Sequence, residues 1–410
     1  MQVMRARLNQ RPLVAAGVSR LVTDAVEQVT NIVEGMHATI ASTALPFGKN
    51  ADERTRGITG LVYGSIRLVN SAVRTSLDHA LSLLPSGPLP GLPRPQWEAL
   101  LAALNGVLGD YLSKTNNPLA IPMSLRRDGQ ALPLNATGLA AALPQPTEKL
   151  LVMAHGLCMN DRQWQRNGHN HGAALAREFG HTPLYLNYNS GRHISENGRE
   201  FAELLETVIK FWPVPVSELL IVAHSMGGLV ARSALHYGAE AGHAWPQRLR
   251  KLVFLGTPHH GAALERGGHW LQSMIGGSRY TAPLSRLGML RSSGITDLRY
   301  GNLLDEDWQS SDRFRPGGSD SRKPLPLPAG VSCYALAATT GARDGDFKDR
   351  LLADGLVSLA SALGQHAQAE RSLTFAPANR WIGYGMNHWD LLDRPEVYAQ
   401  LRHWLSVRGS

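Results

Sequence analysis

The spacing of hydrophobic residues changes character part-way along this 410-residue chain. Over residues 18–41 and 52–84, apolar side chains recur at intervals of three and four, which is the period of an amphipathic helix. A third helix is expected over 97–112, after a stretch dense in proline and glycine. We therefore predict an N-terminal helical region over residues 1–146.

From residue 147 onward, short apolar runs alternate with amphipathic stretches. This alternation is typical of a mostly parallel sheet with helices on both faces, so the fold class is predicted as α/β. Strands are expected over 150–154, 183–188, 219–223, 251–255, 332–338 and 373–375, and helices over 172–178, 195–211 and 229–238.

Composition and charge restrict the class of protein. The hydrophobic fraction of 43% and the charged fraction of 18% are typical of a soluble globular chain. The net charge is +8, but adjacent basic residues never exceed a pair, as at Arg126–Arg127. This scatter indicates a solvated surface and gives no reason to expect nucleic-acid binding.

Two cysteines form no disulfide framework, and no apolar run reaches the roughly 20 residues that span a bilayer. The arginine-rich start of the chain resembles a signal peptide, but Arg20 and Asp24 interrupt its apolar segment. We therefore expect a cytoplasmic location. The helices of the N-terminal region either pack as a bundle against the rest of the chain or a partner, or lie on a membrane or other hydrophobic surface.

One stretch combines a strand, a sharp turn and a helix around a single serine. Four apolar residues at 219–222 precede Ala223, Ser225 and Gly227, and a helical pattern follows from Leu229. Small-x-Ser-x-Gly in this context is the nucleophile elbow, where a strained turn exposes the serine hydroxyl at the edge of the sheet. Ser225 is the predicted nucleophile.

A serine hydroxyl becomes nucleophilic only when a base takes its proton, and in this arrangement an acid and then a histidine follow the serine along the chain. His388 stands in a loop after the last expected strand, and Asp354 stands at a turn before it. We predict His388 as the base and Asp354 as the acid. Weaker alternatives are His366 and His403 for the base, and Asp344, Asp346 and Asp349 for the acid.

The oxyanion of an acyl-transfer intermediate needs two backbone N–H donors. Met226 follows the nucleophile at the start of a helix, where the helix dipole favours negative charge. Leu157 lies in the loop after the first expected strand, where Gly156 permits the turn. We predict Leu157 and Met226 as the donors, with His155 in a structural role.

Two further segments bear on substrate binding. Residues 262–330 form a long insertion, predicted either as a cap or lid over the site or as a peripheral subdomain with its own core. The polar loop over 188–195 falls at the functional edge of the sheet, so Asn187, Asn189 and Arg192 are candidates to bind a polar part of the substrate. Ser195 is expected to cap the helix that follows.

Five motifs occur in order: His155-Gly156-Leu157, Ala223-His224-Ser225-Met226-Gly227-Gly228, Gly256-Thr257-Pro258-His259-His260-Gly261, Asp354-Gly355-Leu356-Val357 and Asn387-His388-Trp389-Asp390. As a set they resemble the branch of the α/β-hydrolase superfamily that holds bacterial lipases and GPI inositol-deacylase-like serine esterases. The resemblance implies an α/β-hydrolase domain over residues 147–410 with Ser225, Asp354 and His388 as its triad. It also implies that His259 and His260 shape a turn beside the site.

The predicted function is that of a serine carboxylesterase or lipase that hydrolyses esters with a hydrophobic acyl part. The alternatives are a thioesterase, amidase or acyltransferase with the same triad, or a membrane- or granule-associated binding protein that uses the hydrolase domain as a scaffold. The expected partner is an ester or lipid substrate. No cofactor and no metal are predicted, although some lipases of this kind hold calcium through an aspartate at the position of Asp390.

Overall fold

The computed structural model describes residues 16–24, 27, 31, 34, 67, 68, 71, 93–262, 292–309, 320, 322–342 and 356–407. The chain forms two compact units: the first comprises Met1–Trp97 and Lys114–Ala120, and the second comprises Glu98–Ser113 and Ile121–Ser410. In the first unit, residues 16–24 are helical, and the Asn117 side-chain amide donates to the Gly17 carbonyl over 3.1 Å. The predicted helix over 52–84 lies almost wholly outside the described residues.

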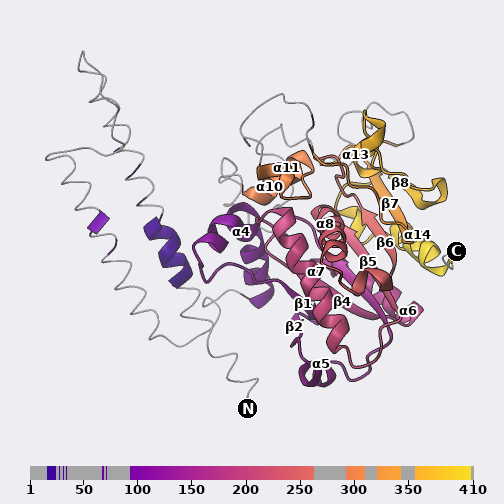
Figure 1. Cartoon of the computed structure of the whole chain (residues 1–410), viewed down its shortest axis with the longest axis horizontal. Coiled ribbons are helices and arrows are strands. Elements are labelled where there is room, and N and C mark those ends of the chain that lie inside the picture. Colours follow the sequence, from indigo (N-terminus) through magenta and orange to yellow (C-terminus); the bar gives the residue numbers. More distant parts are fainter. Residues whose placement is uncertain are drawn as a thin grey trace. The chain divides into compact units, whose positions relative to one another are not determined.

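The second unit is built on an eight-stranded sheet in the order β2-β1-β4-β3-β5-β6-β7-β8. In Figure 1 the strands run from β2 and β1 at one end to β7 and β8 at the other. Strands β3 to β8 run parallel to one another, and β1 is antiparallel to β2 and β4. The strands are β1 (Ser124–Arg127), β2 (Gln130–Ala131), β3 (Lys149–Ala154), β4 (Thr182–Asn187), β5 (Glu218–His224), β6 (Leu249–Leu255), β7 (Ser332–Thr339) and β8 (Arg380–Tyr384).

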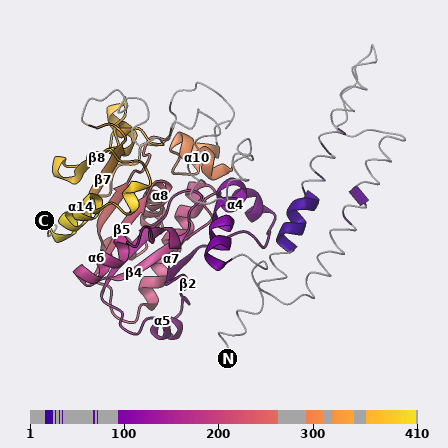
Figure 2. The ribbon, with the colours of Figure 1, turned by 180° about the vertical axis from the view of Figure 1, so that it is seen from behind.

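Helices cover both faces of this sheet, and alternate residues of the central strands face opposite layers. In β3, Val152 packs with the layer of α7 and α8, whereas its neighbour Met153 packs with the layer of α6 and α14. Figure 2 shows the same sheet and helices from behind. The helices are α4 (Arg94–Lys114), α5 (Ala136–Ala142), α6 (His171–Phe179), α7 (Ile194–Phe211), α8 (Met226–Glu240), α10 (Ser293–Tyr300), α11 (Glu306–Gln309), α13 (Leu359–Ala362) and α14 (Pro395–Ser406).

This architecture confirms the predicted α/β class and five of the six expected strands. The strand expected over 373–375 is wrong: the Leu373 N–H bonds to the Gly364 carbonyl in a loop, and the last strand is β8. The sheet-containing unit also begins earlier than the predicted boundary after residue 146. Strand β1 pairs with β4, and Leu125 and Leu139 are fully buried in the core, so these residues fold with the sheet.

The insertion expected over 262–330 is described only in part. Its described residues include α10, α11 and the segment 322–330, which is neither helix nor strand, whereas 263–291, 310–319 and 321 lie outside the description. Among the described residues, none of the helices combines the length and the hydropathy needed to cross a bilayer.

Candidate active site

The centre of the sheet has a topological switch point between β3 and β5. From β3 the chain steps to β4 on one side, and it returns to place β5 on the other side. Ala154 at the end of β3 lies opposite Ala223 near the end of β5. Ligands of open α/β sheets bind outside the carboxyl ends of the strands at such a point. The loops that hold Leu157 and Ser225 start there.

Ser225 occupies the turn between β5 and α8 with an unusual backbone conformation. Its φ of 53° and ψ of −125° lie outside the regions that L-residues with a Cβ ordinarily adopt. The Ser225 N–H donates to the Leu255 carbonyl at the end of β6 over 2.8 Å, and the residue is only 2% exposed. Strand and helix therefore hold Ser225 in the strained turn expected of a nucleophile elbow.

Glycines on both sides of Ser225 let backbones approach closely. A Cβ at Gly227 would lie 2.6 Å from the carbonyl oxygens of Ala154 and His155. A Cβ at Gly156 would lie 3.0 Å from the Ser225 Cβ. These contacts place the loop after β3 directly against the serine turn, so the small residues of both motifs serve the same junction.

His388 reaches the same place from the loop after β8. Gly256, which directly follows β6 with φ +60°, has no room for a side chain, since a Cβ there would lie 2.9 Å from His388 Cε1 and 3.0 Å from its Nδ1. Ser225 bonds to Leu255, and His388 packs on the next residue, Gly256. Both site residues therefore contact the chain at the carboxyl end of β6. The sequence separates these two side chains by more than 160 positions.

The loop that carries His388 is shaped by its neighbours. The Asn387 N–H donates to the Asp390 carboxylate over 2.9 Å, and the Trp389 N–H donates to the Asn387 side-chain oxygen over 2.8 Å. These two bonds close a tight turn around His388. Asp390, the residue considered for calcium, is engaged in this turn and lies 3.8 Å from the Arg394 guanidinium. Among the described residues, no group of three or more His, Cys, Asp or Glu side chains is arranged to hold a metal.

His224 is a site residue that sequence reasoning missed. Its Nε2 lies 3.2 Å from the His388 carbonyl, and the two rings are 4.6 Å apart. Complete burial, with His388 as a further cause, holds the pKa of His224 well below its usual value, so its ring is neutral. A neutral ring donates through Nε2 to that carbonyl and fixes the backbone of His388. In the sequence, the one sign of this role was that His224 directly precedes the serine of the nucleophile elbow.

The two predicted oxyanion donors are both fully buried beside Ser225. Met226 is the first residue of α8, and Leu157 lies in the loop after β3. The next residue, Cys158, has a φ of 60°, and its N–H donates to the Ser190 hydroxyl over 3.0 Å. Burial raises the pKa of the Cys158 thiol to about 12, so this cysteine is not a nucleophile at neutral pH.

His155 holds the loop after β3 in the structural role that was expected. The Tyr188 N–H donates to its Nε2 over 3.4 Å, so the proton resides on Nδ1 and is donated to the Gly156 carbonyl over 2.8 Å. Burial lowers the pKa of His155 to about 4. His259 and His260 were also expected to shape a turn, and both form hydrogen bonds in the turn after β6. The His260 ring lies 3.1 Å from the Gly364 carbonyl.

The predicted acid, Asp354, lies outside the described residues, as do the alternatives Asp344, Asp346 and Asp349. The alternative bases are described. His366 lies 3.3 Å from Asp320, and His403 is exposed on α14.

The loop after β4 uses its polar side chains internally. The Asn189 amide donates to the Gly109 carbonyl over 2.8 Å, and Arg192 pairs with Glu196 and Glu200. The Asn189 bond holds the loop against α4, and the Arg192 pairs hold it against α7. Both side chains are thus already engaged, which argues against Asn189 and Arg192 as substrate ligands. The expected cap at Ser195 is wrong, because α7 begins at Ile194, whose N–H donates to the Asp297 carboxylate over 2.9 Å.

The mostly parallel sheet and the strained serine turn at its switch point define an α/β-hydrolase fold. Residues 146–317 match the family model of the PGAP1-like alpha/beta domain, which confirms the resemblance over the first three of the five motifs. The motifs around Asp354 and His388 lie outside the matched residues. No curated protein matches the chain.

Similar solved structures include lipases. The mature form of Bacillus licheniformis lipase BlEst2 has 18% identity and a TM-score of 0.41, covering 64% of this chain and 94% of its own. Aspergillus fumigatus lipase B has 13% identity and a TM-score of 0.40, with 64% and 53% covered. Phospholipase PlaB from Legionella pneumophila in complex with thio-NAD has 17% identity and a TM-score of 0.31, with 52% and 43% covered.

Proposed function

We propose that the protein is a serine hydrolase of the lipase/esterase type that cleaves carboxylic esters with a hydrophobic acyl part. The observation that carries this proposal is the strained turn at Ser225, with His388 packed on Gly256, the residue directly after β6. A serine at φ 53° costs conformational energy, and such strain is kept where function requires it. The PGAP1-like match over residues 146–317 supports the same class.

In the proposed mechanism, His388 takes the proton of Ser225 while the hydroxyl oxygen attacks the ester carbonyl. The backbone N–H groups of Leu157 and Met226 stabilise the oxyanion, with the N-terminal dipole of α8 adding to the second donor. His388 then protonates the leaving alcohol, and it next deprotonates the water that releases the acid from Ser225. Asp354 is proposed from the sequence as the carboxylate that orients His388.

The test is hydrolysis of p-nitrophenyl esters of short, medium and long acyl chains by wild type and Ser225→Ala. Loss of the nucleophile should reduce kcat by about 10⁴-fold or more while the fold is retained. Ser217→Ala is the matched control, because Ser217 is an exposed serine just before the other end of β5. Its activity should equal that of wild type. An active, folded Ser225→Ala protein contradicts the proposal.

A further inference from the structure

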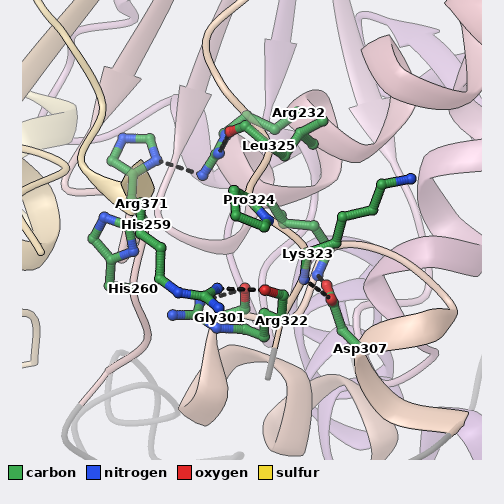
Figure 3. Close-up of a pocket in the computed structure, with 11 residues that line it drawn as sticks. Arg232, His259, His260, Gly301, Asp307, Arg322, Lys323, Pro324, Leu325 and Arg371 are labelled. Atoms are coloured by element: carbon green, nitrogen blue, oxygen red, sulfur yellow. Dashed lines mark hydrogen bonds between the residues drawn. The ribbon is translucent and has the colours of Figure 1, made fainter. Parts of the chain in front are cut away.

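A pocket lies beside the carboxyl end of β6. Its lining includes Arg232 from α8, His259 from the turn after β6, and Lys323 and Leu325 from the segment that follows residue 321. In Figure 3 the Arg232 guanidinium points toward His259, whereas the Lys323 side chain extends to the other side of the pocket. Neither Ser225 nor His388 lines it.

Arg232 is the unusual member of this pocket, because it is a buried cation that makes no ion pair with any carboxylate in the described part of the chain. It is only 5% exposed. One guanidinium nitrogen lies 3.4 Å from His259 Nδ1, and another donates to the Leu325 carbonyl. The Nε–H has no hydrogen-bond partner among the residues that the structure describes. Buried charges in proteins are normally paired, since removing a charge from water is costly.

The neighbouring groups compensate this charge only weakly: burial lowers the pKa of Arg232 to about 10, although the Asp307 carboxylate acts in the opposite direction. Because arginine can only donate, His259 accepts at Nδ1 and stays neutral, and burial together with Arg232 holds its pKa well below the usual value. The Asp307 carboxylate accepts the backbone N–H groups of Leu303, Leu304 and Lys323 over 2.8, 2.9 and 3.0 Å. None of these bonds involves the Arg232 guanidinium.

The other arginines of the pocket already have an anion. Arg322 makes two bonds to the Asp320 carboxylate, over 2.9 and 2.6 Å, and donates to the Gly301 carbonyl. Arg371 lies 3.6 Å from the same carboxylate and also bonds to the Asp320 carbonyl. These charge-assisted bonds help to hold the pKa of Asp320 at about 2. The exposed Lys323 side chain adds a further positive charge.

We propose that this pocket binds a small oxyanion, a carboxylate or phosphoryl group, with Arg232 as its buried cationic donor and Lys323 as a second charge at its mouth. The Arg232 Nε–H is a donor that such an acceptor satisfies, and a bound oxyanion compensates the buried charge. The neutral His259 and the Leu325 carbonyl hold the guanidinium in place. Binding at this site does not depend on the hydrolase activity proposed above.

The first test is calorimetric titration of the full chain with inorganic phosphate, and separately with acetate, at constant ionic strength. Wild type should bind at least one of them saturably. Arg232→Met should lose about tenfold or more in affinity, as expected when a charged hydrogen-bond donor is removed. Arg250→Met, which removes an exposed arginine on β6 away from the pocket lining, is the matched control and should bind as wild type does.

Two milder variants keep the proposal testable if Arg232→Met does not fold. Arg232→Lys retains the charge without the planar fork, and Lys323→Met removes an exposed charge; both should weaken binding. The proposal is overturned if wild type takes up neither anion saturably. It is equally overturned if folded Arg232→Lys and Lys323→Met bind with unchanged affinity.

A kinetic arm distinguishes two sources of the oxyanion. If it belongs to the substrate, Arg232→Lys should raise KM for an ester with a terminal carboxylate and leave KM for the uncharged ester unchanged. If it is a separate small molecule, phosphate should bind to wild type without competing with either ester. Either result supports an oxyanion site and assigns its occupant.

Discussion

At the scale of single residues, the junction around Ser225 depends on positions where no side chain fits. Gly227 is the clearest case, because a Cβ there would lie 2.6 Å from two carbonyl oxygens, those of Ala154 and His155. Both are backbone atoms in a central strand and the loop that follows it, so neither can rotate away. The helix α8 therefore approaches β3 as closely as it does only because residue 227 is glycine.

Gly227→Ala should accordingly destabilise the fold and displace Ser225. We expect a loss of about 1–3 kcal/mol in the free energy of unfolding, as for other overpacked sites. Urea denaturation measures the loss, and ester hydrolysis measures the accompanying fall in kcat. Ala239→Ser, at an exposed position near the end of the same helix, should change neither. A Gly227→Ala protein as stable as wild type contradicts the close approach.

Residues that act through local geometry could be predicted from the sequence, whereas residues that act across the fold could not. The turn at Ser225 is encoded within about ten neighbouring positions, and it forms as expected. The contact between His224 and the His388 carbonyl joins segments 164 residues apart, and no local pattern announces it. The turn that Asn387 and Asp390 close around His388 is an exception, because it is local and was nevertheless missed.

At the scale of elements, helix α4 supports the loop that carries the predicted oxyanion donor Leu157. A Cβ at Gly106 would lie 2.2 Å from the Cys158 Sγ and 3.0 Å from its Cα. Asn189 donates to the Gly109 carbonyl of the same helix, and the Ser292 hydroxyl donates to that of Gly106. Helix α4 thus joins the loop after β3, the loop after β4 and the start of α10.

Gly106→Ala should therefore push Cys158 and misplace the neighbouring Leu157 N–H. We expect kcat to fall by about 10-fold to 1,000-fold, by analogy with the loss of one oxyanion donor, with a smaller change in KM. Steady-state hydrolysis of a p-nitrophenyl ester measures both. The expected loss of activity in Gly106→Ala has a steric cause, the clash with Cys158. A second substitution that relieves this clash should therefore restore activity.

Cys158→Ala provides that relief, because it removes the Sγ and leaves only the contacts near 3.0 Å. The double variant should be more active than Gly106→Ala alone, while Cys158→Ala by itself should retain most of its activity. If the two substitutions act additively, α4 does not reach the oxyanion loop through Cys158.

The hydrophobic periodicity of the sequence correctly predicted the strands that bury a continuous face. It missed the strands in which only one residue is buried. Strands β3 and β5 are apolar almost throughout and were expected within one residue of their observed ends. Strand β8 lies at the sheet edge with only Gly383 buried, and in β1 only Leu125 is buried, so neither buries a continuous hydrophobic face. Their places are set by pairing with β7 and β4, a tertiary effect.

At the scale of the whole molecule, the fold buries several histidines in the neutral state. Burial lowers the pKa of His155 to about 4 and that of His171 to about 3, and it holds the pKa of His224 and His259 well below the usual value. The Nε2 atom of His171 lies 3.3 Å from the Leu391 carbonyl oxygen, and its Nδ1 atom lies 2.9 Å from the Nε2 atom of His169. In the unfolded chain each of these rings regains an ordinary value near 6.5.

This difference makes the folded state sensitive to mild acid. Between the two pKa values the unfolded chain binds more protons than the folded chain, so stability is greatest above pH 6.5 and falls as the pH is lowered towards 4. Each fully buried histidine should contribute a loss of roughly 1.4 kcal/mol per pH unit in that range. Guanidinium denaturation at pH 7, 6 and 5 measures the slope.

His171→Gln isolates one of these contributions. Glutamine does not titrate and can still donate to the Leu391 carbonyl, so the slope between pH 6.5 and 4 should decrease by about one proton relative to wild type. His403→Gln is the control, because His403 is exposed on α14 and its solvent contact changes little on unfolding. Its slope should match that of wild type. Equal slopes for His171→Gln and wild type would mean that His171 takes up its proton in the folded chain as readily as in the unfolded one.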